Sequence, residues 1–345
     1  MVIKRVAGLA ALAWLGLALP ASAAETEVRI GTVASSSDAG FYIADHKGYF
    51  AAEGIKAVFV GFDTAAKMIG PLGTGQLDVG GGAPSAALYN AAGRGIGIKI
   101  VADKGSAPPG NGFQPLLVRK DLVDSGRYKD FKDLKGMKIA NVSPGVSSAA
   151  TLHEFLKRGG LTEADADIIA LPYPQHVVAF HNKGIDASVT IEPSASQAIM
   201  AGDAVRISGD DAVYPGHQVS VVLYSGDFAK NQPEVARKFM RAYIRAIRDY
   251  NDALAGGKLA GPSAEAIIAI LTQETTIKDP ALYKAIVSHG TNPDGRVNLD
   301  SLRRDREFFK AQGQLDGDAP VDAVVDSSFV EAAVKELGPY HPMGK

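Results

Sequence analysis

The sequence predicts two α/β units followed by a helical tail. Short β-type runs alternate with helical segments along the first part of the chain, and this alternation restarts near Phe113. After Pro233 the pattern is almost entirely helical. A chain of 345 residues is long enough for two compact domains. The alternation of strands and helices predicts sheets of mainly parallel strands with right-handed crossovers.

The first unit opens with a β-rich run, 28–33, that ends in the hydroxyl cluster Ser35–Ser37. A helical segment follows over 40–53, and Gly54 is placed to stop it. Strands and helices then alternate up to residue 102. The pattern predicts strands at 56–61, 77–79 and 98–102 and helices at 64–73 and 84–92.

The second unit repeats this organisation, and the tail completes the chain. A helix over 149–158 follows a Pro/Gly/Ser loop, and the long β-type run 219–224 is expected to return the chain to the first unit. The other strands of the second unit are predicted at 113–119, 138–142, 167–171, 188–191 and 205–207. The tail helices are predicted at 233–254, 264–274, 280–288, 299–312 and 327–337.

The N-terminus has the pattern of a secretory signal. Lys4 and Arg5 precede an apolar run over 6–19, and the small-residue pattern that follows predicts cleavage after Ala23. The apolar run is shorter than the ~20 residues that a membrane-spanning helix needs. Because the chain has no cysteine, no lipid can be attached at a lipobox. We therefore expect residues 1–23 to be a signal peptide and the mature chain to be periplasmic, soluble and not lipidated.

Composition excludes several classes of function. Lys plus Arg number 36 and Asp plus Glu 38, so the basic surplus typical of nucleic-acid binding is absent. After loss of Lys4 and Arg5, 34 basic residues face 38 acidic ones, a net charge of −4. The lack of cysteine excludes disulfides, thiolate zinc sites and iron–sulfur clusters. The spacing of the histidines fits no metal site, and no complete nucleotide-binding or serine-hydrolase motif occurs, so we expect no metal and no cofactor.

Three hydroxyl-rich loops follow predicted strands. They contain Ser35–Ser37, Gly82–Ser85 and Ser143–Ser148. Ligands of open α/β sheets bind beyond the carboxyl ends of the strands. The third loop also opens a helix, whose free N–H groups and dipole can hold an oxyanion without a cation. Ordinary helix capping by these serines is the alternative interpretation.

Five segments, in order, resemble one family. They are FYIADHKGYFAAEG at 41–54, GQLDVG at 75–80, DLKGMKIA at 133–140, GIDASVTIEP at 184–193, and the helix that starts with NQPE at 231 and runs to 250. Together they are similar to the periplasmic solute-binding proteins of ABC importers, in the branch that binds nitrate, sulfonates, taurine and thiamine precursors. The resemblance extends from about residue 27 to 310.

The resemblance implies a two-lobe periplasmic-binding-protein fold of type II. Each lobe would be a mixed, mostly parallel sheet flanked by helices, with two hinge crossovers near 117–119 and 220–223. The first lobe would comprise 24–118 plus 223–345, and the second 119–222. The partners implied are a small ligand, an ABC permease and its ATPase, with the protein itself a monomer.

The resemblance also assigns candidate ligand contacts. The first lobe would contribute its first hydroxyl loop and the residues after the glycine run, and the second its anion-binding loop and two aromatic residues. The contacts expected are Ser36, Asp38, Phe41, Ala83, Ser85, Phe113, Gln114, Pro144, Gly145, Ser147, Ser148, Tyr173, Glu192 and Tyr214. We expect no catalytic residue among them.

The ligand is expected to be a small organic anion, either a sulfonate or a carboxylate. An aromatic carboxylate is one form that this hypothesis includes. Because no Arg or Lys stands in the hydroxyl loops, an inorganic anion is less favoured. Asp38 and Glu192 would instead suit an amine or a ring N–H, so a thiamine-type pyrimidine precursor is the alternative ligand. A secreted enzyme using Ser147 or Glu192 and a sensory subunit are the alternatives in other classes. The absent cysteine argues against the fungal pyrimidine synthases that share this fold.

Overall fold

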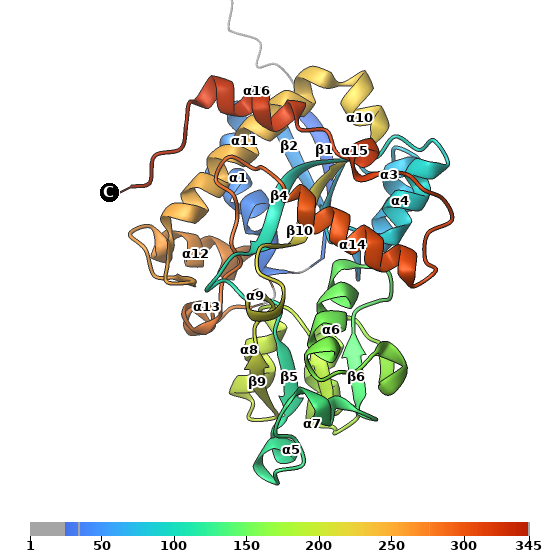
Figure 1. Cartoon of the computed structure of the whole chain (residues 1–345). Helices are drawn as coiled ribbons and strands as arrows, with labels where there is room; N and C mark the ends of the chain where they lie inside the picture. The colour runs from blue at the N-terminus through green and yellow to red at the C-terminus, as the bar shows by residue number, and fades with distance from the viewer. Residues whose placement is uncertain (1–24, 34, 276, 344–345) are drawn as a thin grey trace, which may run out of the picture.

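The protein consists of two lobes, each built on its own five-stranded sheet (Figure 1). The computed structural model describes residues 25–33, 35–275 and 277–343, so the predicted signal peptide lies outside the described residues. The strand order is β2-β1-β3-β10-β4 in the first lobe and β7-β6-β8-β5-β9 in the second. In each sheet, one strand runs antiparallel to both its neighbours: β10 in the first lobe and β5 in the second. This confirms the predicted fold class.

Helices cover both faces of the first sheet, so its central strands are buried on both sides, whereas the edge strand β2 is partly exposed. Its strands are β1 (Thr26–Thr32), β2 (Ile55–Gly61), β3 (Val79–Gly82), β4 (Lys99–Ala107) and β10 (His217–Tyr224). Its early helices are α1 (Ala39–His46), α2 (Tyr49–Ala52), α3 (Ile69–Gly73) and α4 (Ala86–Gly93). Two 3₁₀ turns, η1 (Ser36–Asp38) and η2 (Ala65–Met68), precede α1 and α3.

The second sheet lies below the first in Figure 1. Its strands are β5 (Leu116–Arg119), β6 (Lys138–Asn141), β7 (Asp167–Ala170), β8 (Ala187–Val189) and β9 (Ala204–Ser208). Its helices are α5 (Lys120–Asp124), α6 (Ser147–Arg158), α7 (Tyr173–His181), α8 (Ser194–Met200) and α9 (Asp210–Val213). The 3₁₀ turns are η3 (Phe131–Leu134) and η4 (Glu163–Asp165).

The C-terminal part of the chain is helical, as predicted, and returns to the first lobe. It contains a short hairpin of β11 (Leu254–Ala255) and β12 (Lys258–Leu259). Its helices are α10 (Gly226–Asn231), α11 (Pro233–Asp252), α12 (Ala264–Glu274), α13 (Pro280–Ala285), α14 (Leu299–Ala311), α15 (Val321–Val324) and α16 (Ser328–Leu337). Among the described residues, no helix combines the length and the apolar character that crossing a bilayer requires.

Strand membership shifts both lobe crossings relative to the predicted boundaries. β5 pairs with β8 and β9 and therefore belongs to the second sheet, although 116–118 were expected in the first lobe. β10 pairs with β4 over His217–Tyr224 and with β3 over Val221–Tyr224, so 217–222 belong to the first sheet. The sequence pattern could not reveal this, because a crossing strand is equally apolar in either sheet. The connections therefore lie at 108–115 and 209–216.

The predicted helix over 40–53 is broken in two. Gly48 adopts a left-handed conformation, with φ of 71°, and separates α1 from α2. Gly54, with φ of 71°, ends α2 as expected. Gly40 lets α1 pack closely on α11, since a Cβ at this position would lie only 2.7 Å from the ring of Tyr243.

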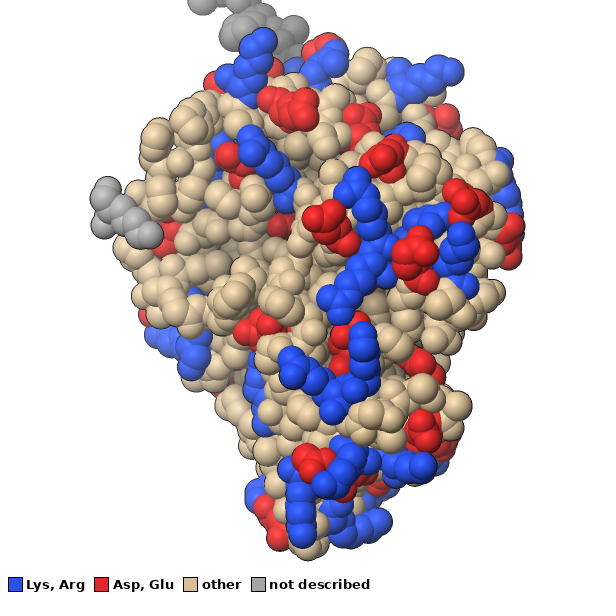
Figure 2. Space-filling view, viewed as in Figure 1, with Lys and Arg blue, Asp and Glu red and all other residues tan. Residues whose placement is uncertain are grey.

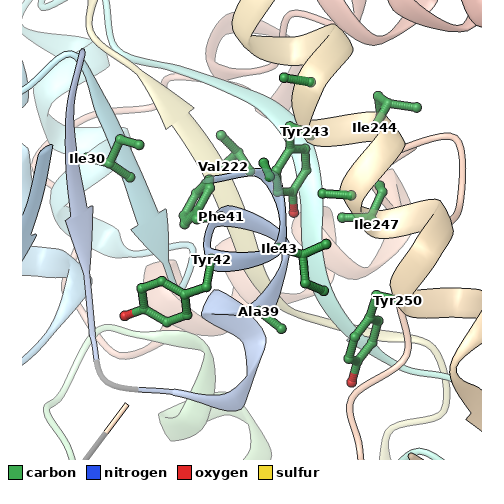
Figure 3. Packing of buried hydrophobic residues seen from close by; sticks show 14 of the residues in the cluster. Ile30, Ala39, Phe41, Tyr42, Ile43, Val222, Tyr243, Ile244, Ile247 and Tyr250 are labelled. Carbon is green, nitrogen blue, oxygen red and sulfur yellow. The ribbon is translucent and has the colours of Figure 1, made fainter. Parts of the chain in front are cut away.

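The hydrophobic core between α1 and α11 also contacts strand β4 of the first sheet. Phe41 on α1 faces Tyr243 of α11 (Figure 3), with ring centroids 5.3 Å apart. The Tyr243 hydroxyl donates to the backbone oxygen of Asp103 on β4, 2.9 Å away. The packing thus joins α1, α11 and β4 into one unit.

The glycine run 80–82 forms β3 itself. A Cβ at Gly81 would collide with the ring of Phe41 and lie 2.7 Å from Cε of Lys104. A Cβ at Gly82 would collide with Ala65. The glycines therefore make room for buried side chains that pack across the strand.

We expect Gly81→Ala to lower the free energy of unfolding by about 1–3 kcal/mol, because the added methyl group overpacks the core. Urea unfolding followed by circular dichroism measures the change. Gly93→Ala is the control, since a Cβ there has no neighbour within 4 Å and should cause no loss. Equal stability of the two variants would contradict the packing role of Gly81.

Candidate functional site

A small cavity lies between the lobes, beyond the ends of the strands. The first lobe and β10 contribute Val33, Ser35, Ser37, Asp63, Thr64, Ala65, Ala83, Val219 and Ser220. The second lobe and the first connection contribute Phe113, Gln114, Val142, Ser147, Tyr173 and Ile191. Five of the predicted contacts therefore line the cavity: Ala83, Phe113, Gln114, Ser147 and Tyr173.

Direct backbone bonds between the lobes close the cavity on two sides. The amide of Ser36 donates to the carbonyl of Glu192, at 3.1 Å. The amide of Ala86 donates to the carbonyl of Gly145, at 2.8 Å, beside an isolated bridge between Ser85 and Val146. Three further predicted contacts, Ser36, Ser85 and Gly145, thus touch the opposite lobe and do not line the cavity. Pro144 borders a separate hollow between the second lobe and α14.

A buried lysine that the sequence analysis missed stands behind the cavity. Lys104 on β4 has a fully buried side chain, and its Nζ lies 2.8 Å from Oδ1 of Asp38, which is also fully buried. The same Nζ donates to the hydroxyls of Ser37 at 2.8 Å and of Ser220 at 3.3 Å. Burial lowers the pKa of Lys104, and Asp38 opposes this by stabilising the charge. The hydroxyl loops themselves hold no Arg or Lys, as the sequence shows, but a lysine of β4 stands behind them.

The signal for Lys104 was present in the sequence. The acid–base pair Asp103-Lys104 directly follows the apolar run 98–102, and we ended the strand at that run. The strand instead continues to Ala107, with Asp103 and Lys104 both about 1% exposed. Charged residues within the continuation of a buried strand indicate a paired polar site.

Asp38 and Phe41 do not contact the cavity. Besides pairing with Lys104, Asp38 accepts from the amide of Ser35 at 3.0 Å, which completes the capping box of η1. Phe41 is fully buried in the core of the first lobe. Both predictions were wrong for one reason: η1 turns Ser35 and Ser37 toward the cavity and directs the next turn inward.

The serines at the start of α6 are already bonded. The Ser147 hydroxyl donates to the carbonyl of Val219 at 2.8 Å, and the Ser148 hydroxyl donates to Oδ1 of Asn141 at 2.6 Å. Ser148 does not line the cavity, and the Ser147 proton is committed to the backbone. The first N–H groups of α6 have no acceptor within the helix, so they remain the donors of this loop.

Glu192 and Tyr214 also lie away from the cavity. Oε2 of Glu192 accepts from the amide of Ser196 at 3.0 Å, and Oε1 lies 3.7 Å from Arg206. Burial raises the pKa of Glu192. Tyr214 packs under α14, where its hydroxyl donates to Asp305 at 2.9 Å. Burial also raises the pKa of Tyr214. Both residues connect elements of the protein to one another.

A buried polar network starts at the cavity wall. The Thr151 hydroxyl lies 2.6 Å from Oε1 of Gln114 and 3.1 Å from Nδ1 of His217. Nε2 of His217 lies 3.1 Å from Oδ2 of Asp305, and both of these side chains are fully buried. The network crosses between the lobes, because Thr151 belongs to α6, His217 to β10 and Asp305 to α14. In Figure 1, α14 lies directly above α6.

Asp210 is a buried carboxyl beside this network. Its Oδ1 accepts from the amide of Gln114 at 3.1 Å, and Oδ2 has no hydrogen-bond partner among the described residues. Burial raises the pKa of Asp210 to about 7, although the nearby His217 opposes the shift. The folded protein therefore holds a proton on this carboxyl at pH values at which the unfolded chain has released it.

We expect this carboxyl to make the protein less stable as the pH rises from about 4 to 7, because the folded state binds more protons than the unfolded state in that window. Asp210→Asn should remove this contribution, on the order of 2–4 kcal/mol across the window. Urea unfolding at several pH values measures it. Asp124→Asn, at an exposed carboxylate of α5, is the control for loss of one acidic group. Parallel profiles for wild type and Asp210→Asn would contradict the assignment.

The face shown in Figure 2 carries both acidic and basic side chains and is not dominated by charges of one sign. Acidic and basic side chains alternate over both lobes there. The charged groups closest to the cavity are the buried pair of Lys104 and Asp38 and the carboxylate of Asp63 in the lining, whereas exposed charges farther away are screened within about 10 Å at ordinary ionic strength.

Comparisons with known proteins agree with this fold. The chain is similar to an alkanesulfonate-binding protein, SsuA of Xanthomonas axonopodis pv. citri bound to MOPS, with 20% identity, a TM-score of 0.69, and coverage of 89% of this chain and 100% of the other. It is also similar to the periplasmic nitrate-binding protein NrtA of Synechocystis PCC 6803, with 16% identity, a TM-score of 0.72, and coverage of 91% and 89%. At these identities the likeness concerns the fold.

A curated relative is similar in sequence. It is a 4-amino-5-hydroxymethyl-2-methylpyrimidine phosphate synthase of Aspergillus parasiticus, 29% identical over 221 residues. The match covers 60% of this chain and 61% of the relative, so the chain spans about three fifths of that protein's length. Residues 21–261, more than two thirds of the chain, match the NMT1-like family. The protein belongs to the NMT1-like family, as the sequence resemblance predicted.

Proposed function

We propose that this protein is the periplasmic solute-binding component of an ABC importer, and that it holds a small organic anion between its lobes for delivery to a membrane permease. One observation carries the proposal: the interlobe cavity is lined by hydrogen-bond donors that are backed by the buried cation of Lys104. The alkanesulfonate- and nitrate-binding proteins that share the fold support it.

The lysine sets the direction in which the cavity hydroxyls donate. An ammonium group has no lone pair, so Ser37 and Ser220 must accept from Lys104. The proton of Ser220 is then free to point into the cavity. Ser37 shares a bond with Ser35 at 3.0 Å, and this pair retains one further proton for a ligand whichever serine donates. Two hydroxyl donors, polarised by one cation, thus face the second lobe.

The second lobe completes an environment for an anion. The N-terminus of α6 brings free N–H groups and the positive end of the helix dipole to Ser147. The Gln114 side chain lies beside the hydroxyl of Tyr173, and burial raises the pKa of Tyr173 to about 12, so its hydroxyl is also a donor. Phe113 and Tyr173 supply apolar ring surface. We therefore favour an organic sulfonate or carboxylate, with an aromatic group as a good fit.

A nitrogen heterocycle is the second candidate, because the curated relative makes a pyrimidine phosphate. This candidate relied on Asp38 and Glu192 to bind a ring N–H. In the structure, Asp38 is paired with Lys104, and Glu192 is bonded to Ser196 and lies near Arg206. We also propose binding without catalysis, since the Ser147 proton goes to a backbone carbonyl and not to a base.

The test is a thermal-shift screen of the mature chain, residues 24–345, against alkanesulfonates, aromatic carboxylates and pyrimidines. A ligand raises the apparent stability by mass action, by about 2.7 kcal/mol at one hundred times its Kd. We expect the strongest shift from an organic anion. A shift from pyrimidines alone would overturn the assignment, and conversion of a hit into product on incubation would overturn the binding-only function.

We expect Ser220→Ala to weaken binding of the best anion about tenfold, because one charge-assisted donor is lost. Isothermal titration calorimetry measures the Kd. Ser125→Ala, on the outer surface of the second lobe, is the matched control and should bind like wild type. Unchanged affinity in Ser220→Ala would show that the hydroxyl does not face the ligand.

A further inference from the structure

The network behind Gln114 contains an ordered series of donors and acceptors. Thr151 lies between the amide oxygen of Gln114, at 2.6 Å, and Nδ1 of His217, at 3.1 Å. His217 in turn lies between Thr151 and the carboxylate of Asp305, at 3.1 Å from its Nε2. All four side chains are 1% exposed or less, so within the network they must satisfy one another.

The protons available to this series decide which nitrogens of His217 donate when Oε1 of Gln114 faces Thr151. A threonine hydroxyl has one proton, and the short bond to Gln114 Oε1 uses it, because an amide oxygen can only accept. Nδ1 of His217 must therefore donate to the Thr151 oxygen. Nε2 must donate as well, since it faces the carboxylate of Asp305, which also accepts from Tyr214 at 2.9 Å. With Oε1 of Gln114 facing Thr151, every bond of the series is satisfied when both nitrogens of His217 carry a proton.

Loss of the Nδ1 proton would reverse the direction of the series. Nδ1 would become an acceptor and Thr151 would turn its proton toward it. The Thr151 oxygen would then need a donor from Gln114, so the amide would rotate by half a turn and present its NH₂ group to Thr151. The end of Gln114 that faces the cavity would change from the donor NH₂ to the acceptor oxygen.

We propose that His217, acting through Thr151, sets the polarity of the Gln114 amide and makes the cavity selective for anions only while the imidazole is protonated. Three observations carry the proposal: Gln114 lines the cavity, the three bonds are continuous, and His217 is paired with Asp305. His217 and Thr151 are positioning residues, since neither touches the cavity. The choice of an anion as ligand rests on the proposed function, whereas the coupling of the amide to the imidazole does not.

The direction of the pH effect follows from this arrangement. A protonated His217 favours anion binding, so the affinity for an anion should fall as the pH rises and His217 loses its proton. By linkage, binding of an anion should be accompanied by proton uptake. The ionisable groups around His217 are Asp305 from α14, Asp210 from α9 and the stacked Tyr214, which has Arg304 over its ring.

The test of the coupling needs no ligand. In the mature chain labelled with nitrogen-15, NMR resolves the ring nitrogens of His217 and the side-chain amide of Gln114 during a pH titration. We expect both groups to change with the same midpoint. In Thr151→Val the Gln114 amide should no longer follow His217, and in Thr151→Ser, which keeps the hydroxyl, it should follow again.

Asp305→Asn provides a second route to the same answer. Removing the carboxylate disfavours the imidazolium, so the midpoints of His217 and Gln114 should both move to lower pH by the same amount. Asp210→Asn keeps an oxygen that can accept the hydrogen bond from the backbone amide of Gln114. It therefore controls for titration of the neighbouring carboxyl. A Gln114 amide that ignores the titration of His217, or an imidazole whose protonation does not change, overturns the proposal.

A binding arm separates this proposal from the proposed function. Benzenesulfonate stays negatively charged throughout the titration of His217, so it is a suitable probe. We expect its affinity for wild type to fall roughly tenfold or more across the His217 titration, and the affinity of Thr151→Val to show no such fall. If no sulfonate or carboxylate binds at any pH, the proposed function fails, while the NMR titration still decides the coupling.

Discussion

Replacing Lys104 by methionine is expected to lower the free energy of unfolding by about 3–5 kcal/mol, because the variant leaves the carboxylate of Asp38 buried without its partner. Both side chains are fully buried and lie 2.8 Å apart, so water cannot replace the lost charge. The effect should be among the largest of any single substitution. It should also abolish binding of organic anions, since Ser37 and Ser220 lose the cation that orients them.

Urea unfolding of the mature chain measures the first effect, and calorimetry with an anion from the screen measures the second. Lys120→Met is the matched control, because its partner Asp124 is 57% exposed and exposed pairs contribute only ~0–1 kcal/mol. The double variant Lys104→Met with Asp38→Asn should recover part of the stability, because it removes the buried charge, but should not recover binding. Equal stability losses in Lys104→Met and Lys120→Met would contradict the buried ion pair.

Phe41→Ala is expected to lower the free energy of unfolding by about 3–5 kcal/mol, through lost apolar burial and the cavity that remains. The ring is fully buried, and its centroid lies 5.3 Å from the ring centroid of Tyr243 and 6.2 Å from that of Phe239. This expectation separates the structural role of Phe41 from the ligand contact that the sequence resemblance implied.

Phe41→Leu keeps most of the apolar volume and should lose less than half as much stability. Urea unfolding and anion calorimetry on both variants decide between the roles. The structure predicts lost stability, with affinity retained in Phe41→Leu. A Phe41→Ala variant that unfolds like wild type but no longer binds an anion would restore Phe41 as a ligand contact.

The fold class was largely predictable because it depends on local patterns. Short apolar runs separated by glycine, and helical periodicity after Pro233, depend on a few neighbouring residues. The predicted tail helices correspond to α11, α12, α13, α14 and α16, with ends that differ by a few residues. The errors occur where a neighbour distant in sequence decides the outcome. The predicted lobe boundaries cut through the crossing strands β5 and β10, whereas each strand belongs to one sheet along its length, because strand pairing is not a local property.

The candidate site was predictable only at the level of loops. The three hydroxyl loops do lie at the interface between the lobes, because strand ends in parallel sheets converge there. Which side chain of each loop faces the cavity was not readable. In η1, Ser35 and Ser37 face the cavity and Asp38 turns inward, a difference of one to three residues within a single turn.

The sequence alone thus determined the two α/β units, the helical tail, the family resemblance and the set of loops that meet between the lobes. These properties follow from residue order, turn chemistry and periodicity. The tertiary structure decided that Lys104 of β4 stands behind the serines of η1 and β10, and that Gln114, Thr151, His217 and Asp305 form one network. The physical reason is that a buried charge or polar group must find its partner in space, and that partner can lie anywhere along the chain.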